Sequence, residues 1–345
     1  MATLHAELSH GLRTFALELT LDVGAETLAL VGPSGAGKSS VLRAVAGLLR
    51  PARGRIALDG ETWLDTTRGI DVPPERRSVG LVFQDYALFP HLTVRRNVAY
   101  GAAERTAVDT LLERFGIGHL ADARPTQISG GERQRVAVAR ALAREPRALL
   151  LDEPLSALDT HTRATVRGEL HDLLAGLGLP VILVTHDFED AATLADRVGV
   201  VVDGRLRQVG TPADLVTAPV DSFVARFTGA NLVPGAVVGS RDALTEVVLD
   251  GGGTMWSTDG ATGRVAVTVY PWEVALSRNV PDDSAVNHVR APITRITSLG
   301  NRARVAVGPL VAEVTTASVE RLALKEGEAV VASFKATAAR LLPLA

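Results

Sequence analysis

The chain has 345 residues, 46% of them hydrophobic and 22% charged, a composition typical of a soluble globular protein with about two domains. Its formal net charge of −3 argues against a general binding surface for nucleic acid or anionic membranes. There is no cysteine, which excludes disulfides and thiol chemistry. No apolar run approaches the roughly 18 residues that span a bilayer, and residues 1–11 lack the pattern of a signal peptide. We therefore expect a cytosolic chain that reaches a membrane only through a partner.

Residues 1–230 alternate apolar runs with helical patterns, which predicts an α/β domain with a largely parallel sheet. Three apolar runs, at 27–31, 148–151 and 181–185, are typical of central strands. Each is followed at once by polar residues. Because ligands bind beyond the carboxyl ends of strands in open parallel sheets, these polar residues are expected to form one site at one sheet edge.

The first of these strands runs into a glycine-rich loop that fits G-x-x-x-x-G-K-[S/T]: Gly32, Pro33, Ser34, Gly35, Ala36, Gly37, Lys38, Ser39 and Ser40. In such a loop the glycines allow backbone N–H groups to surround phosphate oxygens. Lys38 would bind the β- and γ-phosphates, and the Ser39 hydroxyl is placed to ligate Mg²⁺. Helical spacing of apolar residues from Lys38 to Pro51 places the phosphates at a helix N-terminus. The sequence therefore predicts a nucleotide-binding loop.

The other two strands and a fourth strand end add chemistry-bearing residues. Asp152 is expected in the Mg²⁺ shell and Glu153 is expected to orient or deprotonate the attacking water, although acidic strand ends are common. Gln84 could reach the metal and the water, or it could be a solvated loop amide. His186 could bond a γ-phosphate, or it could be structural.

The pattern between about residues 86 and 146 is helical, which predicts a helical subdomain inserted into the sheet domain. Within it, Ser129, Gly130 and Gly131 precede a helix and could form a second anion site; alternatively they are a helix-capping serine with flexible glycines. From residue 231 to 345 short alternating runs and glycine-rich turns predict a small all-β barrel, with a boundary near 231–234.

Taken jointly, these motifs resemble an ATP-binding cassette ATPase in order and rough spacing over residues 10–230; the set is completed by Ser156, Ala157, Leu158 and Asp159. The resemblance implies a head-to-tail homodimer that holds two ATP molecules between its subunits. Ser129 and Gly131 of one subunit would cap the γ-phosphate held by the other subunit's loop. Asp159 would communicate across the interface, and a permease partner would follow the separation of the dimer after hydrolysis.

Two positions depart from the usual pattern of this family. Glu132 stands where glutamine is usual, a change that similar cassettes carry, so activity is expected to survive. Residues 1–14 contain no Phe, Tyr or Trp, so the side chain that stacks on adenine is unassigned. Phe15 is close to this region, but it is expected to pack inside an early strand.

Further segments indicate which class of ATP-binding cassette protein the chain resembles. Residues 83–94 resemble the Q-loop segment of binding-protein-dependent importers, and they would receive a permease helix or form the core of the helical subdomain. Parts of residues 298–338 resemble the β-barrel of molybdate transport ATPases, and residues 69–77 resemble the same branch. This implies an ATPase at the cytoplasmic face of the membrane that serves a molybdate or tungstate importer with a periplasmic or extracellular oxyanion-binding protein.

The cargo remains open at this stage. Where the barrel family usually has Ser-Ala-Arg-Asn, this chain has Ser-Ala-Val-Asn at 284–287, which removes a bidentate anion donor and leaves Lys335 and Thr337 as possible ligands. Sulfate, ferric iron or polyamine import are alternatives, as is an oxyanion-sensing module. A cassette protein acting on ribosomes or DNA is disfavoured by the charge balance.

Overall fold

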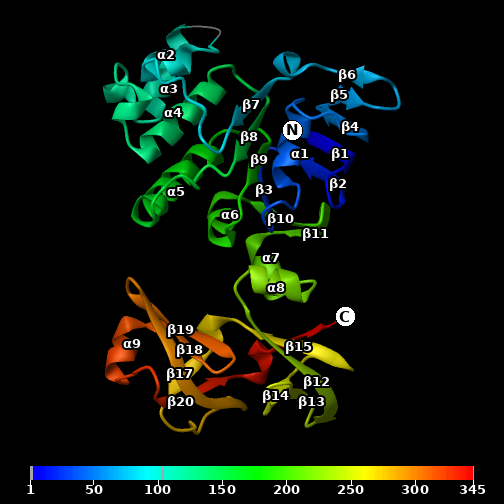
Figure 1. The fold of residues 1–345 in the computed structure, drawn as a ribbon, viewed down its shortest axis with the longest axis vertical. Coiled ribbons are helices and arrows are strands. Elements are labelled where there is room, and N and C mark those ends of the chain that lie inside the picture. Colours follow the sequence, from blue (N-terminus) through cyan, green and yellow to red (C-terminus); the bar gives the residue numbers. More distant parts are fainter. Residues whose placement is uncertain (1–2, 103–104, 345) are drawn as a thin grey trace. The chain divides into compact units, whose positions relative to one another are not determined.

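The computed structural model describes residues 3–102 and 105–344 and divides into two compact units, the first ending at Asp214 and the second beginning at Leu215 (Figure 1). The first unit is built on a six-stranded sheet with the order β11-β10-β3-β9-β8-β7. Its strands are β3 (Thr27–Val31), β7 (Val79–Val82), β8 (Ala148–Asp152), β9 (Val181–Val184), β10 (Arg197–Val202) and β11 (Arg205–Gly210). All neighbouring strands run parallel except β11, which is antiparallel to β10.

The three strands expected at the centre of the sheet are confirmed. β9 lies between β3 and β8, and all residues of β3 and β9 are buried. Their continuous Val, Leu and Ile content follows from this position, because a parallel strand in the middle of an α/β sheet is covered on both faces. The connections are α1 (Lys38–Val45), α5 (Thr160–Ala175) and α6 (Phe188–Leu194).

A second, antiparallel sheet packs with α1 in one hydrophobic core that includes Leu4, Leu8, Val41 and Trp63. Its order is β2-β1-β4-β5-β6, formed by β1 (Leu4–Gly11), β2 (Ala16–Val23), β4 (Arg53–Leu58), β5 (Glu61–Asp65) and β6 (Ile70–Asp71). Buried and exposed residues alternate strictly along β2, as expected for a strand with one face on the core. This sheet supports the loop between β1 and β2, which lies beside the phosphate loop.

The helical segment expected between the strands is present between β7 and β8. It contains α2 (Val94–Ala99), α3 (Arg105–Arg114) and α4 (Gly130–Leu142), with short 3₁₀ turns at Gly118–Leu120 and Pro125–Gln127. Val98, Leu112, Phe115 and Val136 are buried, in keeping with the apolar spacing of the sequence.

The helix after the phosphate loop is shorter than expected. The apolar spacing favoured a helix up to Pro51, but α1 ends at Val45, and Leu48 is 53% exposed. Gly47 follows with φ +81°, a conformation that glycine adopts without strain and that ends a helix. The buried guanidinium of Arg77 donates from Nη1 to the carbonyls of Ala44 and Val45 at 2.8 and 2.9 Å, so the end of α1 is capped by a side chain.

The second unit is all-β apart from short helices, as expected. One five-stranded sheet has the order β14-β13-β12-β15-β21, with β12 (Asn231–Arg241), β13 (Leu244–Leu249), β14 (Thr254–Ser257), β15 (Arg264–Val269) and β21 (Arg340–Pro343). The other has the order β16-β20-β17-β18-β19, with β16 (Ala275–Ser277), β17 (Asn287–Leu299), β18 (Arg302–Val307), β19 (Leu310–Thr315) and β20 (Ala329–Phe334), followed along the chain from β19 by α9 (Thr316–Arg321). Residues of both sheets, among them Val267 and Phe334, share one hydrophobic core.

The division between the compact units lies earlier than residue 230. α7 (Pro212–Thr217) spans the division, and α8 (Ser222–Phe227) belongs to the second unit. Ala225 and Ala230 are buried in a cluster with Leu342, and the hydroxyls of Thr228 and Tyr270 are 2.6 Å apart. These contacts attach the segment that precedes β12 to the β unit, although its helical pattern resembles that of the first unit.

Candidate functional site

The carboxyl ends of β3, β8 and β9 deliver three polar segments to the same edge of the parallel sheet. β3 leads into the phosphate loop, β8 ends at Asp152 and is followed by Glu153, and β9 is followed by Thr185 and His186. The neighbouring order of these strands brings together residues that are more than 100 positions apart in the chain. This arrangement was expected from the three apolar runs.

The phosphate loop lines a cavity of about 360 Å³. Lys38 is only 5% exposed, and its ammonium donates hydrogen bonds of 2.8 Å to the carbonyls of Gly32 and Pro33. Burial lowers the pKa of Lys38, while Glu153 and Asp152 partly offset this. A Cβ on Gly32 would lie 2.0 Å from the carbonyl oxygen of Val201, so the loop can follow this path only with glycine there.

Ser39 and Asp152 form the second feature of the site. The Ser39 hydroxyl donates to Asp152 Oδ1 at 2.9 Å, linking the start of α1 to the end of β8. Burial raises the pKa of the Asp152 carboxyl; the Ser39 hydrogen bond opposes this, and the neighbouring Glu153 charge adds to it. A hydroxyl beside a partly buried carboxylate suits a hard cation such as Mg²⁺, which takes its remaining ligands from phosphates and water.

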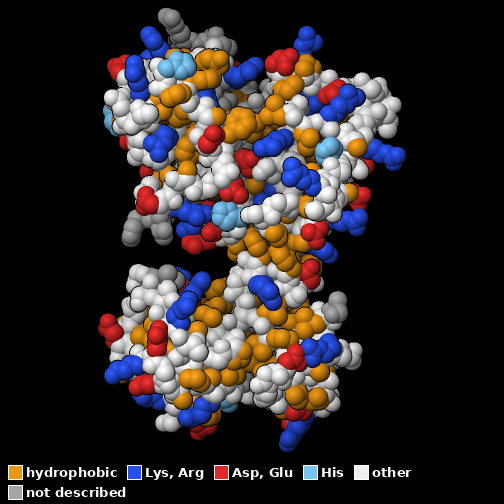
Figure 2. All heavy atoms as spheres, in the orientation of Figure 1, with side chains coloured by type: hydrophobic (Ala, Val, Ile, Leu, Met, Phe, Trp, Pro, Cys, Tyr) orange, Lys and Arg blue, Asp and Glu red, His pale blue; other side chains and the backbone are white. Residues whose placement is uncertain are grey.

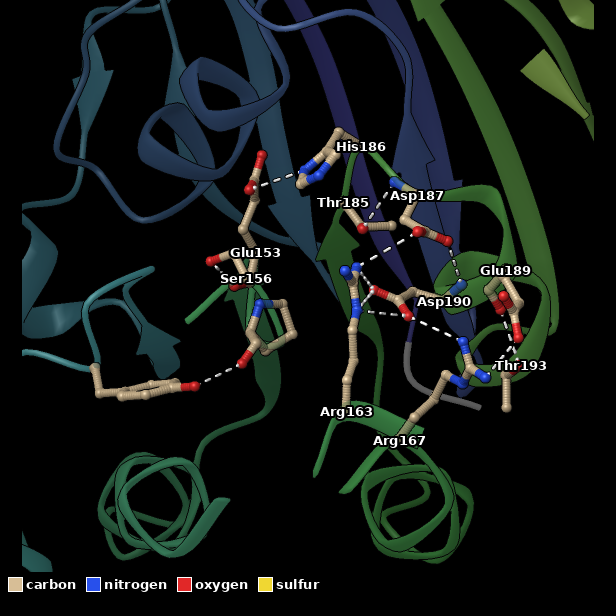
Figure 3. A network of polar contacts seen from close by, with 12 residues as sticks. Glu153, Ser156, Arg163, Arg167, Thr185, His186, Asp187, Glu189, Asp190 and Thr193 are labelled. Carbon is tan, nitrogen blue, oxygen red and sulfur yellow. Dashed lines mark hydrogen bonds and ion pairs between the residues drawn. The ribbon is translucent and has the colours of Figure 1, made fainter. Parts of the chain in front are cut away.

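Glu153 and His186 contact each other across β8 and β9. His186 Nδ1 lies 3.1 Å from Glu153 Oε2 (Figure 3). Glu153 also lines the phosphate-loop cavity, and its φ of +45° is uncommon for a residue with a side chain. Its N–H is fixed by a 2.9 Å hydrogen bond to the Val184 carbonyl. A carboxylate held at a strand end beside the cavity can orient a water molecule and accept its proton.

Gln84 is exposed just beyond β7 and does not belong to the described residues that line the cavity. The segment after it is firmly held, which sequence reasoning missed. Tyr86 and Ala87 have φ values of +62° and +43°, and Arg140 of α4 donates to both of their carbonyls, at 2.8 and 2.7 Å. The buried Tyr86 hydroxyl donates to the Pro154 carbonyl at 3.0 Å. No pattern in the sequence indicated these roles of Tyr86 and Arg140, because their side chains bind backbone atoms that are distant in the chain.

The Ser129 turn fulfils the simpler of its two expected roles. The Ser129 hydroxyl accepts the Glu132 N–H at 3.3 Å, and the Glu132 carboxylate accepts the Ser129 N–H at 2.7 Å, so the pair forms a capping box at the start of α4. That backbone hydrogen bond is the main cause of the lowered pKa of Glu132. The residue that departs from the family pattern therefore has a structural role.

The two glycines of this turn lie against the segment around Asp159. A Cβ on Gly130 would be 2.6 Å from Leu158 Cδ2, and a Cβ on Gly131 would be 2.7 Å from Val166 Cγ2. Asp159 itself is exposed and accepts the Thr162 N–H at 3.1 Å at the start of α5. Among the described residues that line the phosphate-loop cavity, none comes from the 129–131 turn or from Asp159.

Phe15 differs from the sequence expectation. β1 ends at Gly11 and β2 begins at Ala16, so Phe15 lies in the turn between them and not inside a strand. It lines the phosphate-loop cavity together with Leu12, Arg13 and Thr14. The prediction of a strand interior was wrong because the spacing of apolar residues does not reveal where a hairpin turns.

The comparisons with known proteins agree with this geometry. Residues 16–156 match the family model of the ABC transporter, and residues 283–341 match that of the TOBE domain. The molybdate/tungstate import ATP-binding protein WtpC of Pyrococcus abyssi is 39% identical over 94% of this chain and 95% of its own length. The sulfate/thiosulfate import ATP-binding protein CysA of Mycolicibacterium paratuberculosis is 39% identical over 88% of this chain and 80% of its own length. The spermidine/putrescine import ATP-binding protein PotA of Thermobifida fusca is 40% identical over 80% of this chain and 73% of its own length.

A solved structure supports the same assignment. The CbiO1 protein of Clostridium perfringens, described as part of an ABC transporter complex, aligns with a TM-score of 0.55 and 31% identity over 65% of this chain and 92% of its own. The chain belongs to the ABC transporter family as an ATP-binding subunit that carries a TOBE domain. It is a transport ATPase that hydrolyses ATP. None of the helices in the described part of the chain combines the length and the apolar character needed to cross a bilayer.

Proposed function

We propose that this chain hydrolyses ATP to drive the import of molybdate or tungstate through a membrane permease, at the cytoplasmic face of the membrane. The support is the extent of the match with WtpC, which covers 94% of this chain and therefore most of the TOBE region at residues 283–341. The sulfate and polyamine relatives are similarly identical but align over smaller shares of both chains.

The observation that carries the catalytic assignment is the meeting of Lys38, Asp152 and Glu153 at one sheet edge beside the cavity. We assign the triphosphate to residues 32–40, where backbone N–H groups and the start of α1 would bind its oxygens. The Lys38 ammonium, which already has two carbonyl partners, would turn to the β- and γ-phosphates. Phe15 offers the adenine an aromatic surface at the rim of the same cavity.

We assign Mg²⁺ to Ser39 and Asp152, with the exposed side chain of Gln84 as a further ligand once it turns towards the bound nucleotide. Bound there, the ion would neutralise charge that develops on the phosphates. The Glu153 carboxylate would orient the attacking water and accept its proton as the bond between the γ-phosphorus and the bridging oxygen breaks and ADP leaves. His186, 3.1 Å from Glu153, would fix that carboxylate and present its other nitrogen to the γ-phosphate.

The second half of each ATP site is proposed to come from a partner subunit of the same sequence. Ser129, Gly130 and Gly131 lie outside the cavity of their own subunit, and Ser129 is exposed. Its hydroxyl oxygen accepts the Glu132 N–H, and its O–H, which also helps to lower the pKa of the Glu132 carboxyl, would turn from that carboxylate to a phosphate oxygen. In a head-to-tail homodimer the turn would cap the partner's γ-phosphate, with Asp159 close to the shared interface.

A permease helix is proposed to dock on the segment around Phe89. The ring of Phe89 is half-buried, lies 4.4 Å from the ring of Tyr100 and carries the Arg140 guanidinium above it. Tyr100 is 67% exposed. The buried Asn97 side chain accepts the Phe89 N–H at 2.9 Å and donates to the Phe89 carbonyl, so the aromatic surface is preorganised. Hydrophobic side chains gather at several places on the face visible in Figure 2, among them the region of α7 and α8, with charged side chains of both signs between these places.

The first test is the substitution Glu153→Gln. We expect kcat for ATP hydrolysis to fall by about 10²–10⁴-fold, the usual contribution of a positioned base, while ATP binding persists. Because ATP would no longer be consumed, the variant should accumulate as an ATP-loaded dimer in size-exclusion chromatography with light scattering.

The matched control is Glu246→Gln in β13, the same chemical change in the other unit, which should leave turnover and oligomeric state unchanged. A Glu153→Gln variant that keeps full turnover would contradict the catalytic assignment. An ATP-loaded variant that stays monomeric would contradict the dimer.

The cargo has an alternative. Import of sulfate or of a polyamine is the second candidate, because the sulfate and polyamine relatives are as identical to this chain as the molybdate relatives are. In addition, Asn287 is fully buried, and its side chain is hydrogen-bonded to the N–H and the carbonyl of Trp256 instead of facing an anion. Transport assays with radiolabelled molybdate, sulfate and spermidine, using the chain together with its permease, would decide between them. Uptake of sulfate or spermidine but not molybdate would refute the proposed cargo.

A further inference from the structure

A buried charge cluster joins α5 to α6 next to the catalytic edge. The Asp190 side chain is 2% exposed and contacts two arginines of α5 (Figure 3). Arg163 donates from Nε at 3.1 Å and from Nη2, and Arg167 donates from Nη1 at 3.2 Å. Because a carboxylate removed from water needs its counter-charges, this cluster fixes one face of α5 to α6.

The same cluster reaches the segment that carries His186. Asp187 follows His186 and caps α6 by accepting the Asp190 N–H at 3.1 Å. Its other carboxylate oxygen lies 3.6 Å from Arg163 Nη2. Arg163 is therefore positioned by the residue next to His186 as well as by α6.

A different face of α5 touches the Ser129–Gly131 turn. Val166 is buried, and its Cγ2 approaches Gly131 so closely that there is no room for a Cβ. One turn further, Glu169 accepts a hydrogen bond from Arg135 of α4. α5 thus contacts the catalytic segment with one face and the start of α4 with another.

We propose that α5 is a rigid connector between the two ATP sites of the dimer, with Arg163 and Asp190 as the positioning pair that holds it. This inference rests on the proposed head-to-tail dimer. In that dimer His186 belongs to the site built on its own phosphate loop, whereas the Ser129–Gly131 turn of the same subunit completes the partner's site. A displacement of the His186 segment by a γ-phosphate is passed through Asp187, Arg163 and Val166 to the turn that caps the other ATP.

The test compares Arg163→Gln and Asp190→Asn with wild type in the full chain. Two coupled ATP sites give a Hill coefficient for ATP hydrolysis of up to about two. We expect this coefficient to fall towards one in both variants, while the affinity of the monomer for a fluorescent ATP analogue stays within about twofold, because the phosphate loop is not altered. In the Glu153→Gln background, dimerisation by ATP should weaken by at least about tenfold.

Two further variants separate a connector from a merely structural helix. Val166→Ala should also lower the Hill coefficient, because Val166 supplies the atoms nearest to the Cβ position of Gly131. Leu170→Ala, a buried change one turn further along α5, should lower the melting temperature without lowering the Hill coefficient. Arg205→Gln, which breaks an exposed ion pair with Glu18, controls for loss of an arginine. If Arg163→Gln does not fold, Arg163→Lys replaces it, with the same expected direction.

The outcomes distinguish this proposal from the proposed dimer. If the Glu153→Gln protein itself does not dimerise with ATP, the dimer is refuted and the connector with it. If it dimerises but wild type has a Hill coefficient of one, the two sites are not coupled, and the dimer stands while the connector is refuted. The same conclusion follows if wild type is cooperative and the Arg163, Asp190 and Val166 variants keep its Hill coefficient. A lowered melting temperature with unchanged cooperativity would likewise show that the cluster only stabilises the fold.

Discussion

At the scale of single residues, the site contains charged groups that are partly buried. Lys38 and Asp152 are both partly removed from solvent. Burial lowers the pKa of Lys38 and raises the pKa of Asp152, so it favours the neutral form of each group. Burial of these two charges lowers the stability of the ligand-free protein, because the unfolded chain would leave both groups in water. The site is therefore expected to gain stability when a ligand supplies compensating charge.

The Asp152 carboxyl provides a test of this cost. A pKa raised by folding means that the protonated form is favoured in the native state, so the ionised carboxylate lowers stability above that pKa and the penalty disappears as the pH falls through it. Asp152→Asn should raise the melting temperature of the nucleotide-free protein by about 2 °C at neutral pH, with a smaller gain near pH 4. Thermal unfolding followed by circular dichroism at a series of pH values would measure this.

Asp250→Asn is the control of opposite sign. The pKa of the Asp250 carboxyl is lowered by its hydrogen bonds from Arg264, so that carboxylate stabilises the fold at neutral pH and the contribution is lost on acidification. Its substitution should lower the melting temperature at neutral pH. An Asp152→Asn variant that behaves in the same way would show that the Asp152 carboxylate is not held at a cost.

At the scale of elements, the phosphate loop depends on how α1 ends as well as on how it begins. Arg77 comes from the stretch that follows the antiparallel sheet, and it binds the last carbonyls of α1, the Val72 carbonyl and Asp71. Gly47 is needed for its approach, since a Cβ there would lie 2.9 Å from Arg77 Nε. The arginine-rich stretch that resembles the molybdate branch thus has a structural role in this fold.

Arg77→Gln should lower the free energy of unfolding by about 3 kcal/mol, because it leaves buried carbonyls without donors and removes the buried one of the two arginines that pair with Asp71. Urea unfolding of the full chain would measure the change. Arg76→Gln, an exposed neighbour, should have an effect within about 0.5 kcal/mol. Equal effects of the two substitutions would show that the cap on α1 contributes nothing.

At the scale of the whole molecule, the two units are separate compact bodies whose division precedes α8. The cluster of Ala225, Ala230 and Leu342, with the Thr228–Tyr270 contact, makes α8 part of the β unit. A stretch with helical periodicity can therefore belong to a β domain when its apolar side chains cover the edge of that domain's core.

A fragment of residues 215–345 should accordingly melt several degrees above a fragment of residues 231–345, since the shorter one loses buried apolar contacts worth about 1–3 kcal/mol. Differential scanning calorimetry of both fragments tests this. Tyr270→Phe in the longer fragment isolates the hydrogen bond to Thr228 and should account for a small part of the difference. Identical melting temperatures would place α8 outside the cooperative unit.

The sequence by itself determined the class of fold, the central strands, the phosphate loop and the residues that follow β8 and β9, because these depend on local spacing and on the rule that parallel strands deliver ligand-binding residues to one edge. The tertiary structure decided the end of α1, the place of Phe15, the backbone partners of Arg140 and Tyr86, and the side of the division on which α8 lies. Each of these depends on contacts between residues far apart in the chain, which no local pattern encodes. The pairing of Arg163 with Asp190 is the same kind of fact, since charged residues on two helices become partners only when the sheet sets the helices side by side.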